Sequence, residues 1–146
     1  MSAFFSQIQN GISTASAEET EAIAAELSTH LPEDQVLALH GDLGAGKSTF
    51  VRGLAKAWGI NRPITSPTYN LMNVYQGSRQ LIHVDAYRLE DPTEADALLI
   101  EDLLRAPWCL AIEWPEKMPS YWMKNAWHVA LAIDHHHHSI QLNLPS

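Results

Sequence analysis

Apolar residues follow two different rhythms along the chain. Residues 36–39 and 109–112 are short apolar runs without alternation, which are typical of strands buried in a parallel sheet. Residues 71–75 and 81–85 are also strand-like. The second pattern is alternation: residues 127–133 and 140–144 alternate apolar and polar positions, which predicts an antiparallel hairpin.

Three helices are predicted among these strands. Ser16 and Glu19 form a capping box, and apolar residues at a four-residue spacing continue the helix behind it. A second helix is expected over residues 48–58. A third is expected to begin at residues 91–94, where an Asp can cap and a Pro occupies the first helical position. Residues 61–68 hold two prolines and are expected to form a loop.

Strands that alternate with helices and end in an antiparallel pair predict an α/β fold. We expect a three-layer domain of the P-loop NTPase kind, with a mostly parallel central sheet and an antiparallel C-terminal edge. The 146 residues suit one domain, residues 1–146. Hydrophobic residues make up 46% of the chain and charged residues 18%, a balance that indicates a packed globule and argues against disorder.

The charge balance narrows the possible partners. The formal net charge is −8, and a domain that grips nucleic acid by itself needs a dense cationic face. Action beside an RNA that a partner protein holds stays possible. The single cysteine, Cys109, excludes an intrachain disulfide framework and a cysteine-rich zinc module. No membrane-spanning run and no basic secretory leader are recognisable, so a cytoplasmic protein is expected.

One glycine-rich run carries the strongest chemical signal. It matches the P-loop pattern G-x-x-x-x-G-K-[ST] and reads Gly41-Asp42-Leu43-Gly44-Ala45-Gly46-Lys47-Ser48. Glycines allow the backbone N–H groups to curl inward into an anion nest, and the following helix directs its positive end to the same place. Lys47 would supply a cation for the outer phosphates, and the Ser48 hydroxyl can be a ligand of Mg²⁺.

Two carboxylates stand where apolar strands end. Asp85 is the last residue of the strand over residues 81–85, and Glu113 follows the apolar run over residues 109–112. Ligands of open α/β sheets bind outside the carboxyl ends of the strands, so both acids are expected at the P-loop crevice. One could hold Mg²⁺ while the other orients the attacking water. Glu113 could instead be a solvated loop acid.

Two neighbouring positions are open to two interpretations. Trp114 is either a core or lid aromatic, or a ring that covers the site or meets a partner. Thr68 lies where switch-type NTPases keep a loop that senses the γ-phosphate, but the same prolines also suit a plain connection.

Four runs in the chain resemble the TsaE (YjeE) family in order and spacing, from about residue 16 to the last strand. They are Gly41 to Ser48, Ser66 to Tyr69, His83 to Leu89 and Glu113 to Pro115. Members are bacterial ATPases that take part in making threonylcarbamoyladenosine in tRNA. The chain departs from the family pattern in having Ser48 where Thr is commoner, and in its unusual turn of four histidines at 135–138, which we expect to be flexible and polar.

The resemblance implies a site. The phosphates of ATP would be wrapped by the loop residues Gly41, Asp42, Leu43, Gly44, Ala45, Gly46, Lys47, Ser48 and Thr49. Ser48 and Glu113 would ligate Mg²⁺, and Asp85 would be the strand-end acid of the metal site. Trp114 would lie by the nucleotide, the segment from Ala17 to Thr20 would approach the adenine, and Thr68 would belong to the switch loop.

The resemblance also implies two partner proteins, TsaB and TsaD. TsaD transfers the threonylcarbamoyl group, the TsaE-like subunit hydrolyses ATP, and tRNA is met only through the complex. Slow hydrolysis by the isolated chain is expected for another reason, because the sequence shows no arginine finger. A GTPase would usually carry an Asn-Lys-x-Asp guanine reader, which the sequence lacks. A small-molecule kinase needs a second pocket and usually an arginine-rich lid. A non-hydrolysing nucleotide-binding module stays open, because no arginine finger is evident in the chain itself.

Overall fold

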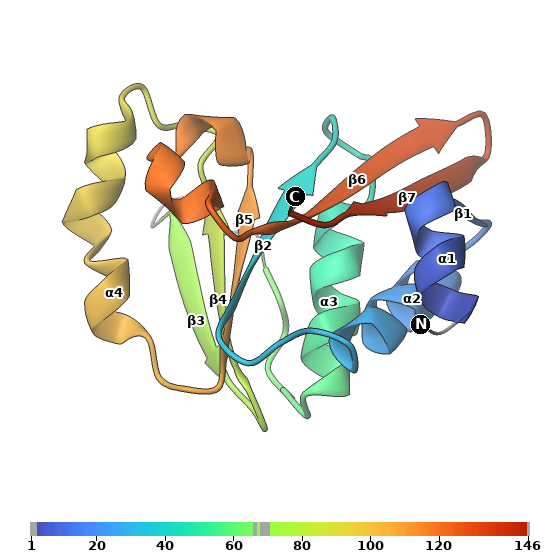
Figure 1. Ribbon diagram of the computed structural model, residues 1–146, viewed down its shortest axis with the longest axis horizontal. Coiled ribbons are helices and arrows are strands. Elements are labelled where there is room, and N and C mark those ends of the chain that lie inside the picture. Colours follow the sequence, from blue (N-terminus) through green and yellow to red (C-terminus); the bar gives the residue numbers. More distant parts are fainter. Residues whose placement is uncertain (1–2, 66, 68–70, 146) are drawn as a thin grey trace.

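The computed structural model describes residues 3–65, 67 and 71–145, arranged around one seven-stranded sheet (Figure 1). The strand order is β1-β7-β6-β2-β5-β4-β3. The strands are β1 (Ile12–Thr14), β2 (Gln35–His40), β3 (Met72–Gln76), β4 (Gln80–Asp85), β5 (Trp108–Glu113), β6 (Trp127–Asp134) and β7 (His137–Asn143). The neighbours β4, β5, β2 and β6 pair in parallel.

The expected parallel centre and antiparallel C-terminal pair are confirmed, since β6 and β7 form an antiparallel hairpin. Antiparallel pairing is more extensive than predicted. It also joins β3 to β4 at one edge of the sheet and β1 to β7 at the other. The three-residue β1 is too short to produce an alternation that a sequence pattern can reveal.

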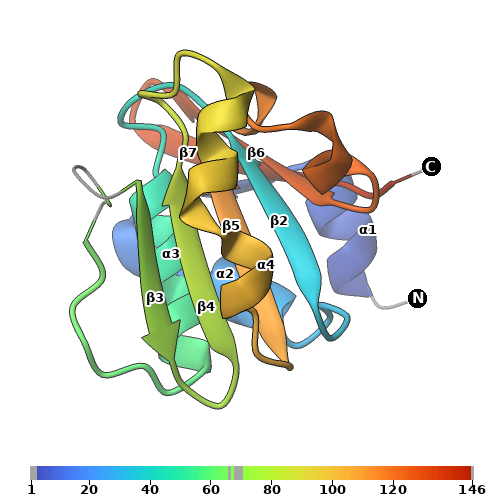
Figure 2. The ribbon, with the colours of Figure 1, turned by 90° about the vertical axis from the view of Figure 1, so that its left-hand side faces the viewer.

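Helices cover both faces of the sheet. Figure 2 shows α4 in front of the strands and α3 behind them. The helical segments are α1 (Ala3–Asn10), α2 (Ala17–Ser28), α3 (Lys47–Ala57), η1 (Pro92–Leu98), α4 (Ile100–Leu103), η2 (Pro115–Lys117) and η3 (Ser120–Met123). None of the helices in the described part of the chain is long and apolar enough to cross a membrane.

The two faces carry separate hydrophobic clusters, because successive side chains of a strand point to opposite sides. On β4 and β5, Leu81, Cys109 and Ala111 belong to the cluster that contains the buried residues of α2 and α3. Their neighbours Ile82 and Leu110 belong to the other cluster. This alternation decides where the ends of the strands project: Asp85 and Glu113 continue the series that faces α3.

The start of α2 follows the predicted capping box. The Ser16 hydroxyl accepts a hydrogen bond from the Glu19 backbone N–H at 3.1 Å, and the Glu19 carboxylate accepts from the Ala15 N–H at 3.0 Å. A 3.1 Å bond from the Thr20 N–H to the Ser16 carbonyl oxygen completes the turn. The local sequence is therefore sufficient to begin this helix.

The third predicted helix begins as expected, since Asp91 caps it by accepting from the Thr93 N–H at 2.9 Å and Pro92 is its first residue, but it does not continue as one α-helix. The segment after Asp91 is a 3-10 helix, Pro92–Leu98, which ends at Leu99 with a left-handed φ of 52° before the single turn of α4. This break buries Ala95 and Ile100 while Leu99 stays 58% exposed. Packing against the sheet therefore decides which apolar residues of this segment are buried.

The histidine turn is shorter than expected. Strands β6 and β7 continue to Asp134 and from His137, so only His135 and His136 form the turn, and His135 has a left-handed φ of 57°. His137 and His138 belong to the β-ladder, where they pair with Asp134 and Ile133. Two of the four histidines are therefore held by strand pairing rather than by a flexible loop.

Candidate functional site

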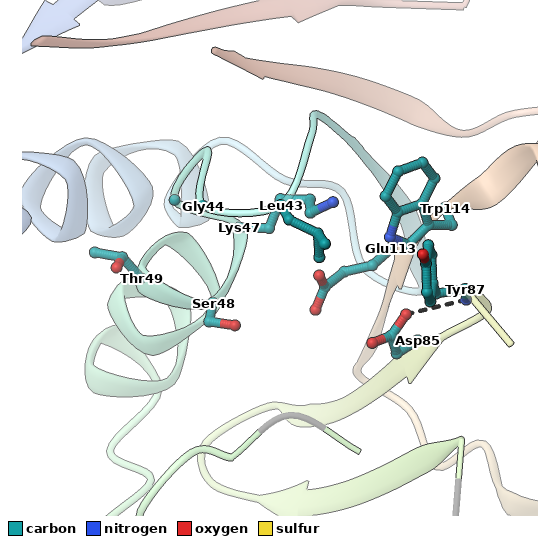
Figure 3. A pocket seen from close by; sticks show the side chains of 10 residues that line it. Leu43, Gly44, Lys47, Ser48, Thr49, Asp85, Tyr87, Glu113 and Trp114 are labelled. Carbon is teal, nitrogen blue, oxygen red and sulfur yellow. Dashed lines mark hydrogen bonds between the residues drawn. The ribbon is translucent and has the colours of Figure 1, made fainter. Parts of the chain in front are cut away.

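A cavity of about 280 Å³ opens at the carboxyl edge of the parallel strands, between the glycine-rich loop and the ends of β4 and β5 (Figure 3). It is lined by Leu43, Gly44, Gly46, Lys47, Ser48, Thr49, Asp85, Tyr87, Glu113 and Trp114. Three segments that are distant in the sequence supply these residues. The convergence of the loop with both strand-end acids agrees with the expected crevice.

The backbone of the loop depends on its glycines. Gly41 has a φ of 148°, and a Cβ atom there would stand 2.4 Å from the Leu131 carbonyl oxygen of β6. Gly46 has a φ of 103° and begins α3 without a side-chain cap. The first backbone N–H groups of α3 are therefore not used by a capping side chain, which leaves the positive end of the helix directed at the cavity.

Lys47 is held inside the site rather than extended into solvent. The residue is 5% exposed, and its ammonium group donates to the Gly41 carbonyl oxygen. The same nitrogen lies 4.3 Å from the centroid of the Trp114 ring, a cation–π contact. Because an ammonium has three N–H donors, one bond to Gly41 does not exhaust its capacity for an anion.

The two carboxylates lie side by side. The β4–β5 pairing places Asp85 directly opposite Glu113. Asp85 is half-buried, and its carboxylate accepts from the Tyr87 N–H at 3.1 Å. Figure 3 shows the Ser48 side chain pointing toward them from the start of α3. Three oxygen-bearing side chains thus face one another across the cavity.

Glu113 is tied to a buried histidine. Its Oε2 lies 2.6 Å from Nε2 of His83, whose side chain is wholly buried, while Glu113 itself is 5% exposed. Nδ1 of His83 has no hydrogen-bond partner among the described residues. Glu113 is therefore not a solvated loop acid. The contact follows from the strand alternation, since His83 stands two residues before Asp85 on the face that meets α3.

The Trp114 ring, which contacts the Lys47 ammonium, is itself packed against Tyr87. Trp114 takes a left-handed φ of 58°, a conformation that costs a bulky residue on the order of 1–3 kcal/mol and persists where the surroundings impose it. Its ring packs against Tyr87 at a centroid distance of 5.1 Å, and the Lys117 ammonium lies 5.1 Å from the Tyr87 ring. Trp114 thus lines the cavity at Lys47, as the interpretation of a covering ring requires.

Two histidines pair with each other next to the loop. Nε2 of His40, the last residue of β2, lies 2.8 Å from Nδ1 of His128 on β6. His40 lines a small cavity of about 100 Å³ together with Gly41, Asp42 and Trp114. Burial lowers the pKa of His40, and the nearby His128 lowers it further. The pair joins the two strands on which the loop rests.

Other predicted site residues do not line the cavity between the loop and the strand ends, or lie outside the described residues. Ala17 is exposed at the start of α2, and Thr20 is buried with its hydroxyl 2.7 Å from that of Thr14. Neither lines the cavity, so their approach to adenine stays a prediction. Ala45 belongs to the loop, but its side chain is buried in the cluster that contains the residues of α2 and α3. Thr68 lies outside the described residues, and its switch role stays a prediction as well.

Sequence reasoning assigned no role to two histidines that the structure places at the site. His83 could have been found from its position in the β4 alternation. His138 could not, because its side chain meets Gly46 only through the β7 register: a Cβ atom on that glycine would stand 3.4 Å from the His138 ring.

The donor set suits a hard cation. No group of three or more His, Cys, Asp and Glu side chains that could hold a metal ion occurs among the residues that the structure describes. Mg²⁺ does not need one, because it keeps several waters and is usually held by one or two carboxylates together with phosphate oxygens. Asp85, Glu113 and the Ser48 hydroxyl fit that requirement.

Fold and site together define an α/β protein in which a glycine-rich loop and two strand-end carboxylates share one cavity. A family model described as "Threonylcarbamoyl adenosine biosynthesis protein TsaE" matches residues 14–141. The chain therefore belongs to the TsaE family.

Individual relatives carry the same family name. Proteins named tRNA threonylcarbamoyladenosine biosynthesis protein TsaE are 44% identical in Nostoc sp. over 110 residues and 39% identical in Bacillus subtilis over 102 residues. These matches cover 72% and 69% of this chain but 67% and 63% of the relatives, so the chain spans about two thirds of their length. The crystal structure of Bacillus subtilis YdiB is similar with a TM-score of 0.72 and 28% identity, covering 93% of this chain and 85% of that one.

Proposed function

We propose that this protein is a Mg²⁺-dependent P-loop ATPase that supports threonylcarbamoyl transfer to the adenosine next to the anticodon of tRNA, by acting on a complex of TsaB and TsaD. One observation carries the ATPase part: Lys47, the open N-terminus of α3 and the pair Asp85–Glu113 converge on a single cavity. Family membership carries the link to tRNA modification. The lone, wholly buried Cys109 suits the reducing cytoplasm in which this reaction would take place.

In this proposal the loop and Lys47 bind the triphosphate. The backbone N–H groups at the start of α3 hold the phosphates, and the Lys47 ammonium turns from the Gly41 carbonyl to the outer phosphate oxygens. Ser48, Asp85 and Glu113 would hold Mg²⁺, which would neutralise charge on the phosphates. The Trp114–Tyr87 pair limits the access of water to this end of the cavity.

Glu113 has a further role in the proposal. His83 fixes one of its carboxylate oxygens, so the group presents a defined orientation to a water aimed at the γ-phosphate. This leaves Asp85, which is less buried, as the acid closer to bulk solvent at the metal site.

The proposed activity is slow in the isolated chain. No arginine is among the ten residues that line the cavity, and an arginine that neutralises transition-state charge contributes about 10³–10⁵ in rate to related NTPases. We therefore expect the TsaB–TsaD complex to complete the site. The proposed switch role of Thr68 and the approach of Ala17 and Thr20 to adenine belong to the same model.

The experiment is a phosphate-release assay of the chain alone and with purified TsaB–TsaD, comparing ATP with GTP. We expect slow ATP turnover that rises on addition of the partners and a smaller response to GTP. ATP binding without turnover in either condition would support a non-hydrolysing module instead.

Lys47→Ala tests the phosphate cradle itself. We expect partner-stimulated turnover to fall by about 10²–10³, because one cationic donor to the phosphates is lost. Lys56→Ala is the matched control, since Lys56 lies on the same helix and its ammonium binds Glu21 outside the cavity. Equal ATP affinity and turnover in Lys47→Ala and the control would contradict the proposal.

A further inference from the structure

His138 occupies a position that the proposed reaction does not use. On β7, Ile140 and Leu142 face the cluster under α2 and α3, and His138 is the next residue in that alternation. The core ends before it, so its half-buried ring reaches the glycine-rich loop. A Cβ atom on Gly46 would stand 3.4 Å from Cδ2 and 4.0 Å from Nε2 of this ring.

The loop has two different flanks. Asp85 and Glu113 stand at the ends of β4 and β5, and Figure 3 shows Ser48 pointing toward them while Thr49 points the opposite way. These groups mark the end of the cavity that would hold the outer phosphates and the cation. Because a triphosphate is extended, the nucleoside must leave the loop on the other flank, which β6 and β7 form.

On the second flank, strand pairing joins β6 and β7 to β1. His138 is paired with Thr14 of β1, and the Thr14 hydroxyl is bonded to Thr20 in the first turns of α2. A series of contacts thus connects Gly46 through His138 and Thr14 to the start of α2. Ile133, the β6 partner of His138, lies 3.9 Å from a Cβ position on Gly44.

We propose that His138 is a specificity-determining residue that contacts the nucleoside part of the bound nucleotide, with its imidazole ring stacked against the purine. Of the two side chains that β6 and β7 bring against the loop glycines, Ile133 offers only an aliphatic surface. A planar ring gives a purine a stacking partner that the aliphatic side chain does not. This inference rests on the proposed nucleotide binding.

The test measures affinity rather than turnover. Dissociation constants for Mg-ATP and for inorganic tripolyphosphate, which has no nucleoside, are determined by calorimetry for the unchanged protein, His138→Ala, His138→Tyr and His136→Ala. His136→Ala is the matched control, since that residue is exposed in the same hairpin turn. Thermal unfolding of each variant establishes that the hairpin is intact.

We expect His138→Ala to weaken ATP binding about tenfold, as loss of one stacking partner does, and to leave tripolyphosphate binding unchanged. His138→Tyr, which keeps a ring, retains most of the ATP affinity, and His136→Ala has no effect. An unchanged ATP affinity in His138→Ala would overturn the inference. So would equal losses for ATP and tripolyphosphate, because the ring would then act on the loop. If the unchanged protein binds neither compound, the proposed function itself fails.

Discussion

The contact between Glu113 and His83 separates two consequences of changing the acid. Removing the carboxylate altogether leaves both ring nitrogens of a wholly buried imidazole without a partner, which costs stability as well as chemistry. Glutamine keeps an oxygen that can accept from Nε2 but lacks the negative charge. Comparing the two substitutions therefore distinguishes support of the fold from action on the phosphate.

Glu113→Gln should lower kcat for ATP hydrolysis by about 10², while the dissociation constant for ATP changes less than about threefold. Glu113→Ala should show the same loss of turnover together with a lower melting temperature. Turnover measured with the partner complex, calorimetric affinities and thermal unfolding provide the comparison. Parallel losses of affinity and kcat in Glu113→Gln would mean that the acid acts only by holding the metal.

The His40–His128 pair makes a prediction about pH. Burial, His128 and Lys47 lower the pKa of His40 from its ordinary value of 6.5, and Glu116 opposes them. The unfolded chain therefore takes up this proton before the folded chain as the pH falls. The stability that the neutral ring contributes is present above pH 6.5 and is lost progressively below it.

Urea unfolding at several pH values between 5 and 8 measures this effect. In His40→Gln the free energy of unfolding should fall less steeply below pH 6.5 than in the unchanged protein. His136→Gln, in the exposed turn, should retain the original slope. A steeper fall in His40→Gln than in the unchanged protein would show that the folded chain holds this proton more tightly, contrary to the expected pKa.

At the scale of elements, α2 and α3 cross at a single glycine. A Cβ atom on Gly53 would stand 2.5 Å from the Glu21 carbonyl oxygen and 2.7 Å from Cβ of Ala24. Both atoms belong to the α2 helix, so neither can move without shifting the whole element. The crossing sets the position of α3, and the glycine-rich loop is attached directly to its N-terminus.

Gly53→Ala should destabilise the protein by up to about 2 kcal/mol. Overpacking costs about 1–3 kcal/mol, and alanine recovers only about 1 kcal/mol through its higher helix propensity. Denaturation midpoints measure the change, with Lys56→Ala on the exposed side of the same helix as the control. A variant more stable than the unchanged protein would show that the helices have room to separate.

The elements that the sequence predicts well are those with strong local signals. The apolar run at β5 predicts a buried strand because both of its faces are covered, and the capping box at Ser16 specifies the start of α2 by itself. The left-handed break at Leu99 has no such signal. It depends on which apolar side chains the sheet can accommodate, and this is a tertiary property.

At the scale of the whole molecule, the candidate site also combines residues that the sequence predicts with residues that only the tertiary structure places. The convergence of Lys47, Asp85 and Glu113 is predictable because parallel strands end at one edge of a sheet. His83 and His138 are less easily predicted than these three residues. His83 is fixed by alternation within one strand, whereas His138 reaches Gly46 only because β7 begins three residues earlier, at His137, than the pattern over residues 140–144 indicates.

The distribution of charge over the molecule bears on whether the chain can bind tRNA by itself. Nine Lys and Arg residues stand against 17 Asp and Glu. Three of the cations, Arg52, Lys56 and Arg62, line one cavity of about 390 Å³ beside α3. Glu21 pairs with Lys56 and lies 3.8 Å from Arg52, so this surface is partly neutralised within the chain. A phosphate backbone would find few uncompensated cations here.

The isolated chain should therefore bind tRNA with a dissociation constant weaker than about 100 µM at physiological salt, and be retained on tRNA only with TsaB–TsaD present. Gel shifts with the chain alone, the partner complex and the mixture measure this. Glu21→Gln gives a sharper comparison, since it releases Lys56 and Arg52 and should strengthen salt-sensitive binding by the chain alone. Micromolar, salt-sensitive binding by the unchanged protein would show instead that Arg52, Lys56 and Arg62 already suffice as a cationic face.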